Sequence, residues 1–247
     1  MSGHSKWATI KHKKGAVDKA RGKLFAKLIR QVEVAAREGG GDLDSNATLR
    51  TMYQKARDSS VPLDTIERAI KRGTGELEGV NYEQVSYEGY APHGVAVFLE
   101  ALTDNRNRTG AEIRSLFSKS GGSLAEPAWQ FDRKGVVMVP GSLDEEDVLM
   151  AALEAGAEDV AREGDLWRVT TEATETMAVR DALLAQGVEV TSADLTMMPQ
   201  NMIELTTAGD ARQVLNVMDM LDDHDDVQGV YANFDVPDSV MAELEKD

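Results

Sequence analysis

Apolar residues early in the chain recur at steps of three and four, the period of an α-helix with one buried face. From Ala16 onward the apolar positions are Val17, Ala20, Leu24, Leu28, Val32 and Ala35. The glycines of "REGGG" then end the pattern, as expected of a helix stop. The sequence therefore predicts a long amphipathic helix that begins near Ala16.

Two shorter helices are predicted after it. The first covers 45–58, with Ser45 or Asn46 as its N-terminal cap. The second lies in "DTIERAIKRGTG", where Asp64 and Glu67 have the spacing of a capping box and a glycine follows the last basic turn. Together the three helices predict a small N-terminal helical unit.

Strands and helices alternate in the rest of the chain. The segment "QVSYEGYAPHGVAVFLEALTD" predicts two strands joined at "APHG". A helix is predicted from Thr109, with Glu112 completing a Thr-x-x-Glu capping box. The segment "AWQFDRKGVVMVP" reads as a strand that is broken at Lys134 and Gly135.

The following segment has the βαββαβ order of a ferredoxin-like fold, and Pro199 ends it. Its predicted elements are strand 136–139, helix 144–155, strands 158–162 and 166–171, helix 175–186 and strand 188–198. The last segment adds a strand, a helix and a strand that have no partners among themselves. We expect them to complete the α/β unit begun near residue 82.

The predicted fold class is therefore α+β with three domains. An N-terminal three-helix domain is followed by two ferredoxin-like α/β domains, the last inserted in the second. The predicted domains are 1–79, then 80–134 together with 200–247 as one discontinuous domain, and 135–199 as the acidic insertion.

Composition narrows the class of protein. The chain is 42% hydrophobic and 28% charged, which is ordinary for a soluble globular protein, and no apolar run reaches the roughly 20 residues that span a membrane. It contains no cysteine, which excludes disulfides and cysteine nucleophiles and suits a reducing cytoplasm. We expect a cytoplasmic protein without a secretory signal, since the charged start does not lead into an apolar stretch.

Charge is segregated along the chain. Residues 1–80 contain 16 Lys and Arg against 10 Asp and Glu, whereas residues 135–247 contain 5 against 26, a net charge of −21. Such an asymmetry suggests that one segment faces a polyanion and that another repels it. The acidic C-terminal domains could instead meet a protein partner.

No catalytic or metal-binding motif is recognisable. None of the four histidines has triad or HExxH spacing, and His93 is expected to be a turn residue. "DDHDD" at 222–226 resembles a metal site, but a solvated acidic helix end is the simpler interpretation because nothing indicates a distant ligand. "DLDSN" at 42–46 begins like a calcium loop, but Ala47 replaces the glycine of the sixth position and Tyr53 replaces the glutamate of the twelfth. We predict a non-enzymatic protein without metal or cofactor.

A basic arm gives the strongest functional signal. In "KWATIKHKK" four lysines surround an aromatic ring and a protonatable ring; the residues are Lys6, Trp7, Lys11, His12, Lys13 and Lys14. Lysines neutralise phosphates, and tryptophan can stack on an exposed base. The alternative is a solvated tail with Trp7 docked on the protein's own surface.

Two further groups of cations extend this signal. The predicted first helix carries a second stripe, roughly opposite its apolar face, formed by Lys19, Lys23, Lys27 and Arg30. Arg106 and Arg108 precede a predicted helix N-terminus, where free N–H groups favour anions, so they are possible secondary phosphate contacts. The alternative for these two arginines is an internal ion pair with the acidic inserted domain.

Several motifs together resemble the YebC/PmpR family: "GHSKWATIKHKK", "LFAKLIRQVEVAAREGGGDLDSNATLR", "IERAIKRGTG", "YEGYAPHGVAVFLEALTDNRNRT" and "GGSLAEPAWQFDRKG". The resemblance implies three domains and a cytoplasmic DNA-binding transcriptional regulator, although the family includes a mitochondrial translational activator. It also implies that the basic N-terminal motif falls on the arm residues named above. One departure is that Ala128 and Trp129 follow "GGSLAEP" at once, about three residues earlier than in relatives.

Two functions stay open. A helix-turn-helix reader would present its second helix to bases, but the predicted helix starts with Asp64 and Glu67, which a phosphate-lined groove repels. An irregular Lys/His/Trp arm suits folded RNA. We predict a nucleic-acid-binding regulator of transcription. The alternative, which the resemblance implies for some members of the family, is a ribosome- or rRNA-associated factor that assists translation through proline-rich sequences.

Overall fold

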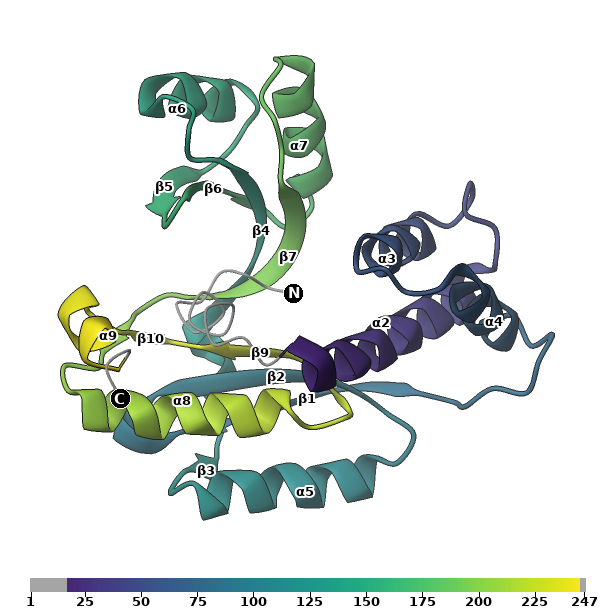
Figure 1. Cartoon of the computed structure of the whole chain (residues 1–247), viewed down its shortest axis with the longest axis horizontal. Coiled ribbons are helices and arrows are strands. Elements are labelled where there is room, and N and C mark those ends of the chain that lie inside the picture. The colour runs from purple at the N-terminus through teal and green to yellow at the C-terminus, as the bar shows by residue number, and fades with distance from the viewer. Residues whose placement is uncertain (1–16, 245–247) are drawn as a thin grey trace.

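The N-terminal part of the protein is a bundle of three helices (Figure 1). The structure is a computed structural model that describes residues 17–244, with side chains from residue 22. The helices are α2 (Val17–Gly39), α3 (Ala47–Asp58) and α4 (Leu63–Gly73). Their shared core includes Leu28, Val32, Leu49 and Ile66. The predicted helical unit is confirmed, and Asn46 caps α3 by accepting the Leu49 N–H at 2.9 Å.

The start of α4 differs from the prediction. Pro62 is the residue before the helix, and no side chain caps it. The fixed φ angle of proline suits a helix start, so α4 begins at Leu63 and Asp64 lies inside its first turn. The predicted capping box at Asp64 and Glu67 is therefore wrong.

Helices α2 and α4 cross closely at Gly73. A Cβ added there would overlap the carbonyl oxygen of Glu33 and lie 2.7 Å from Ala36 Cβ. We expect Gly73→Ala to lower the free energy of unfolding by about 2 kcal/mol through overpacking, measured by urea denaturation. Gly22→Ala is the matched control, because no atom of the described residues lies within 4 Å of a Cβ at that helical position. It should stabilise the protein by up to about 1 kcal/mol; equal effects of the two changes would contradict the close crossing.

A four-stranded antiparallel sheet forms the middle of the molecule. Its order is β3-β1-β2-β9, made from β1 (Glu83–Tyr90), β2 (Ala96–Thr103), β3 (Ser123–Leu124) and β9 (Val227–Ala232). Helices α5 (Arg106–Lys119) and α8 (Ala208–Asp222) cover one face of it (Figure 1). Phe117, Leu99 and Met218 are among the fully buried side chains between sheet and helices. The edge strand β9 therefore comes from the far end of the chain.

Short elements complete this unit. The turn at 91–94 contains the 3-10 helix η1 (Pro92–Gly94), in which His93 has a φ of 64°, so its predicted turn position is confirmed. The remaining elements are the parallel pair β8 (Ile203–Glu204) and β10 (Phe234–Asp235), the 3-10 helix η2 (Ala128–Gln130) and helix α9 (Asp238–Leu244). Helix α9 is absent from the sequence prediction.

A second four-stranded sheet is formed by the segment between β3 and β8. Its strands are β4 (Phe131–Pro140), β5 (Asp159–Glu163), β6 (Leu166–Glu172) and β7 (Ser192–Pro199), and its helices are α6 (Glu145–Glu154) and α7 (Thr176–Ala185). The antiparallel order β5-β6-β4-β7 is that of a ferredoxin-like fold. The α+β class with a helical unit and two α/β units is confirmed. The domain limits at 79, 134 and 199 stay a prediction. The division of the strands between the two sheets supports it.

Two local predictions in this part of the chain are wrong. Strand β4 runs unbroken through Lys134 and Gly135, which pair with β6 on one side and β7 on the other. The glycine is a packing requirement rather than a break, because a Cβ at residue 135 would overlap the hydroxyls of Thr171 and Thr176. Helix α5 starts at Arg106 rather than Thr109, since Asn105 is the cap and accepts the Arg108 N–H at 3.0 Å. No helix within residues 17–244 is long and apolar enough to cross a membrane.

Candidate nucleic-acid interface

The predicted arm precedes the part of the chain that the structure describes. Lys6, Trp7, Lys11, His12, Lys13 and Lys14 all lie outside the described residues. Lys19 belongs to α2, but its side chain lies outside them as well. Contact between these residues and nucleic acid stays a prediction.

The described part of the α2 stripe faces the C-terminal end of α8. Lys23 Nζ donates to the Asp223 carbonyl oxygen at 2.8 Å, and Lys27 Nζ donates to that of Asp222 at 2.7 Å. Both lysines also form ion pairs of 3.2 Å with the carboxylates of the same two residues. The last carbonyl groups of a helix carry partial negative charge, so two lysines there stabilise α8 and attach α2 to it.

Arg30 makes the third contact of this kind. Its Nη1 donates to the Asp225 carbonyl oxygen at 2.5 Å and to Asp226 Oδ1 at 3.0 Å. The stripe is therefore not an open basic surface at Lys27 and Arg30, whose side chains are largely covered. Their partners lie some 195 residues away, so no local pattern could reveal them. Nucleic-acid contact by the stripe stays a prediction, and it requires release from α8.

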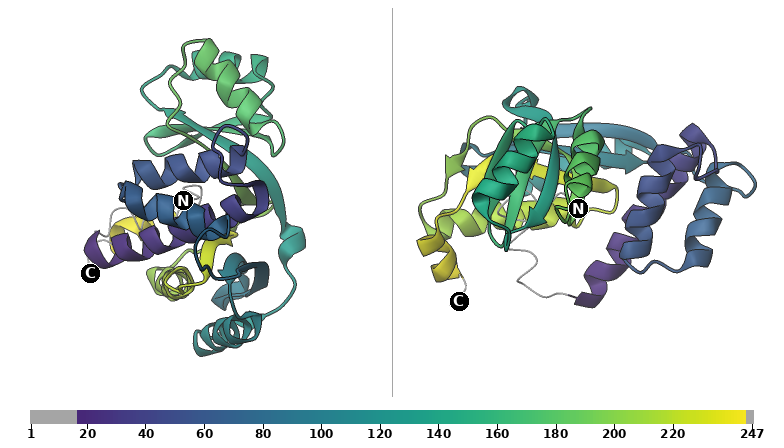
Figure 2. Two further views of the ribbon diagram at one scale, coloured as in Figure 1. Left: turned by 90° about the vertical axis from the view of Figure 1, so that its right-hand side faces the viewer. Right: turned by 90° about the horizontal axis from the view of Figure 1, so that it is seen from above.

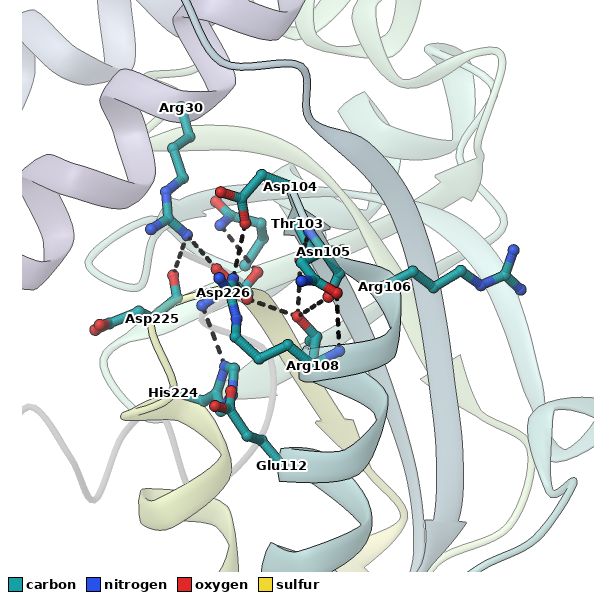
Figure 3. A network of polar contacts seen from close by, with 12 residues as sticks. Arg30, Thr103, Asp104, Asn105, Arg106, Arg108, Glu112, His224, Asp225 and Asp226 are labelled. Carbon is teal, nitrogen blue, oxygen red and sulfur yellow. Dashed lines mark hydrogen bonds and ion pairs between the residues drawn. The ribbon is translucent and has the colours of Figure 1, made fainter.

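Asp226 lies at the centre of this network (Figure 3). Its side chain is only 5% exposed, yet it joins three elements. Arg30 of α2 donates to Oδ1. Two groups of α5 donate to Oδ2, namely Arg108 Nη2 at 2.8 Å and the Thr109 hydroxyl at 2.7 Å. Burial by itself raises the pKa of the Asp226 carboxyl. The hydrogen bonds from Thr109 and Arg108 and the nearby arginine charges outweigh burial, so the pKa lies below its ordinary value.

The two candidate arginines of α5 point in different directions (Figure 3). Arg108 binds Asp226 and Asp104, each at 2.8 Å, and the hydrogen bond to Asp226 raises the pKa of Arg108. Arg108 thus forms an internal ion pair, but the expectation that its partner lies in the inserted domain is wrong, because Asp226 belongs to the middle unit. The Arg106 side chain is exposed, points away from the network and makes no hydrogen bond or ion pair within residues 22–244, whereas its backbone carbonyl oxygen accepts the Tyr87 hydroxyl at 3.3 Å. Arg106 stays a candidate phosphate contact.

The segment 222–226 is also contacted by a distant acidic residue, Glu112 of α5. Asp226 N–H donates to His224 Nδ1 at 3.2 Å, so the proton of a neutral imidazole lies on Nε2 and is donated to Glu112 Oε2 at 2.9 Å. The view of this segment as a solvated acidic end without a distant ligand is wrong, since Asp226 is buried and Glu112 comes from α5. Ligand atoms of Glu112, His224 and Asp226 lie within 4.8 Å of one another. Because the Asp226 oxygens already bind two arginines and a hydroxyl, the group acts as an ion-pair node, and the predicted lack of a metal stays a prediction.

A second buried carboxylate was missed by the sequence analysis. Glu33 binds Arg72 Nε at 2.9 Å, Arg37 Nη2 at 3.3 Å and the N–H of Val80 at 3.2 Å. It thereby holds α4 and the segment after it against α2. The sequence did contain a signal for it, because Glu33 is one of only two acidic residues among the strongly basic residues 1–37. A further ion pair, from Lys55 of α3 to Asp194 of β7, joins the helical unit to the inserted unit.

The chain is similar to known proteins over nearly its whole length. Residues 5–76 match the family model described as the TACO1/YebC protein N-terminal domain, and residues 82–234 match the model described as the TACO1/YebC second and third domain. A "Probable transcriptional regulatory protein" of Rubrobacter xylanophilus is 57% identical over 249 residues, covering 99% of each chain. One of the same description from Halothermothrix orenii is 53% identical over 250 residues, also covering 99% of each.

A solved structure has a similar fold. The crystal structure of a conserved hypothetical protein from Aquifex aeolicus matches with a TM-score of 0.83 and 45% sequence identity. The match covers 94% of this chain and 98% of that one. The arrangement of the helical unit and the two α/β units is thus shared with a protein known from experiment.

Proposed function

Because the chain belongs to the TACO1/YebC family, we propose that it is a non-enzymatic, cytoplasmic, DNA-binding regulator of transcription that contacts nucleic acid through its basic N-terminal arm. One observation carries the proposal: the first seventeen residues contain four lysines, two histidines and a tryptophan but no carboxylate. Relatives of closely similar length and sequence are described as probable transcriptional regulatory proteins. A polycationic segment with an aromatic ring suits a phosphate backbone with accessible bases.

Salt dependence offers a quantitative test of this contact. If the arm and the first helix neutralise about five phosphates of duplex DNA, log K should fall with log salt at a slope of about −4. Fluorescence anisotropy on a labelled duplex between low and physiological salt measures that slope. A slope near zero would contradict electrostatic binding by the arm.

The α2 stripe can be tested separately through its acidic partners. We expect the double change Asp222→Asn and Asp223→Asn to remove the ion pairs of Lys23 and Lys27, while their hydrogen bonds to the two backbone carbonyl groups stay. The weaker hold on the lysines should raise the affinity about two- to three-fold, with a salt slope steeper by at most about 2. The control is Glu175→Gln with Glu189→Gln, which removes the same charge from exposed positions of the inserted unit. Equal affinities of the two variants would show that the carboxylates of Asp222 and Asp223 do not compete with phosphates for the stripe.

The alternative is a ribosome- or rRNA-associated translation factor, and helix α4 favours it. Asp64 and Glu67 are both exposed on that helix, so it would present carboxylates to a DNA groove.

Sedimentation of a native lysate at moderate salt, with and without DNase, separates the two functions. Migration in the nucleoid fraction that DNase abolishes supports the DNA-binding regulator. Co-migration with ribosomes that survives DNase, and that is lost when the arm lysines are changed to glutamate, supports the translation factor. Migration with neither would contradict the proposed nucleic-acid contact.

A further inference from the structure

The two helices of the inserted unit carry apolar side chains on their outer faces. On α6, Leu149, Met150 and Leu153 are 40%, 62% and 57% exposed. The inner face of the same helix is also apolar, because Val148, Ala151 and Ala152 are buried in the core of the unit. A ten-residue helix that covers a sheet normally turns a polar face to water. The outer apolar residues of α6 are therefore unexplained by the fold of this chain.

Helix α7 extends the same feature. Met177 and Leu184 are exposed on it, whereas Val179 and Leu183 pack inward. Both helices lie on the outer side of the inserted sheet, and no other described element covers them (Figure 2). Single exposed apolar residues are common, but a cluster on two neighbouring helices marks an interaction surface. We call Leu149, Met150, Leu153, Met177 and Leu184 the α6–α7 face.

The charge around this face decides what can bind it. Residues 135–199 contain fourteen Asp and Glu and only three arginines. Each arginine is already engaged: Arg162 with the carbonyl oxygens of Gly141 and Gly164, Arg168 with Glu163, and Arg180 with Asp181. Exposed carboxylates adjoin the apolar residues along α6, at Glu145, Glu146, Asp147 and Glu154. This surface repels nucleic acid and attracts lysine and arginine.

We propose that the α6–α7 face is a docking surface for a basic amphipathic segment of a protein partner. Leucine-type side chains of such a segment would cover Met150 and Leu153, while its lysines would meet the carboxylates beside them. The arrangement places the partner on the inserted unit. The proposal does not depend on that function.

The methionines of the chain provide the readout. Met150 and Met177 belong to the face, whereas Met202 and Met220 are exposed elsewhere and serve as internal controls. The full-length protein, labelled with ¹³C at the methionine methyl groups, would be titrated with a helical Leu/Lys peptide of about 18 residues, or five turns. A Leu/Glu peptide of the same length is the charge control. We expect shifts at Met150 and Met177 with the basic peptide only, and unchanged signals at Met202 and Met220.

A variant confirms the location. Met150→Lys combined with Leu153→Lys should weaken peptide binding at least about tenfold, a loss typical of central interface residues. Because both side chains are exposed, the far-UV circular dichroism and Tm should stay as in the wild type. Met220→Lys, on α8, should bind normally. Equal shifts at all four methionines, no shifts at Met150 and Met177, or wild-type affinity of the double variant would each overturn the proposal.

Discussion

Replacing Asp226 by alanine is expected to lower the free energy of unfolding by about 3 kcal/mol, because breaking a buried ion pair leaves its partners uncompensated. The change removes the carboxylate that accepts from Arg30, Arg108 and Thr109 together, and it leaves Arg30 only its contact with the Asp225 carbonyl oxygen. Urea denaturation followed by tryptophan fluorescence measures the effect. We expect the unfolding transition to become less cooperative, because the helical unit is then held less firmly to the middle sheet.

Asp225→Ala is the matched control. Asp225 is exposed, and its contact with Arg30 uses the backbone carbonyl group, which the substitution keeps. Its effect should stay within about 0.5 kcal/mol, as for other surface changes. Similar losses in both variants would mean that the net negative charge of the segment matters rather than the buried carboxylate.

The same residue predicts a dependence of stability on pH. Since the pKa of Asp226 is lowered on folding, its contribution is complete above the unfolded value near about 3.9 and is lost as the pH falls through the lower folded value. We therefore expect the difference in unfolding free energy between wild type and Asp226→Asn to be constant from neutral pH down to about 5 and to shrink below about 4. A difference that does not change with pH would contradict an ionised Asp226.

Reversing the charge of Lys11, Lys13 and Lys14 to glutamate is expected to abolish nucleic-acid binding, with an affinity at least about 100-fold lower at physiological salt. Three phosphate contacts become three repulsions, whereas the fold is expected to be unchanged. Anisotropy with a duplex and with a structured RNA measures the loss. Circular dichroism checks the helical content.

A control of equal charge separates contact from long-range repulsion. Arg114, Lys119 and Arg133 are exposed on α5 and β4, so changing them to glutamate alters the net charge by the same amount outside the arm. We expect this variant to lose only a few-fold in affinity, through the weaker overall field. Equal losses in the two triple variants would place the binding surface outside the arm.

Much of the fold followed from local periodicity. The helical unit and the βαββαβ segment were predictable because each apolar stripe or alternation reports its own buried face. Element ends were less predictable. The spacing of Thr109 and Glu112 suggested a cap, but the Thr109 hydroxyl instead binds Asp226, 117 residues later, and Asn105 caps the helix.

The candidate site was also less predictable, because its contacts join residues that lie far apart in the sequence. Lysine and arginine at helical spacing looked like a free basic stripe, and "DDHDD" looked like a free acidic end. The structure pairs the two, which depends on the packing of α2 against α8 and on no pattern within either segment. Charge complementarity between distant segments could be noticed in the sequence, but their contact could not.

The edge strand β9 has a consequence for biosynthesis. A nascent chain leaves the ribosome from its N-terminus, so β1, β2 and α5 emerge well before α8 and β9, with the whole inserted unit in between. The helical and inserted units can fold as they appear, whereas the middle sheet must wait with its apolar face uncovered. Until then Lys23, Lys27 and Arg30 lack their acidic partners in the segment 222–226. We therefore expect the half-made protein to be more cationic and more dependent on chaperones than the finished one.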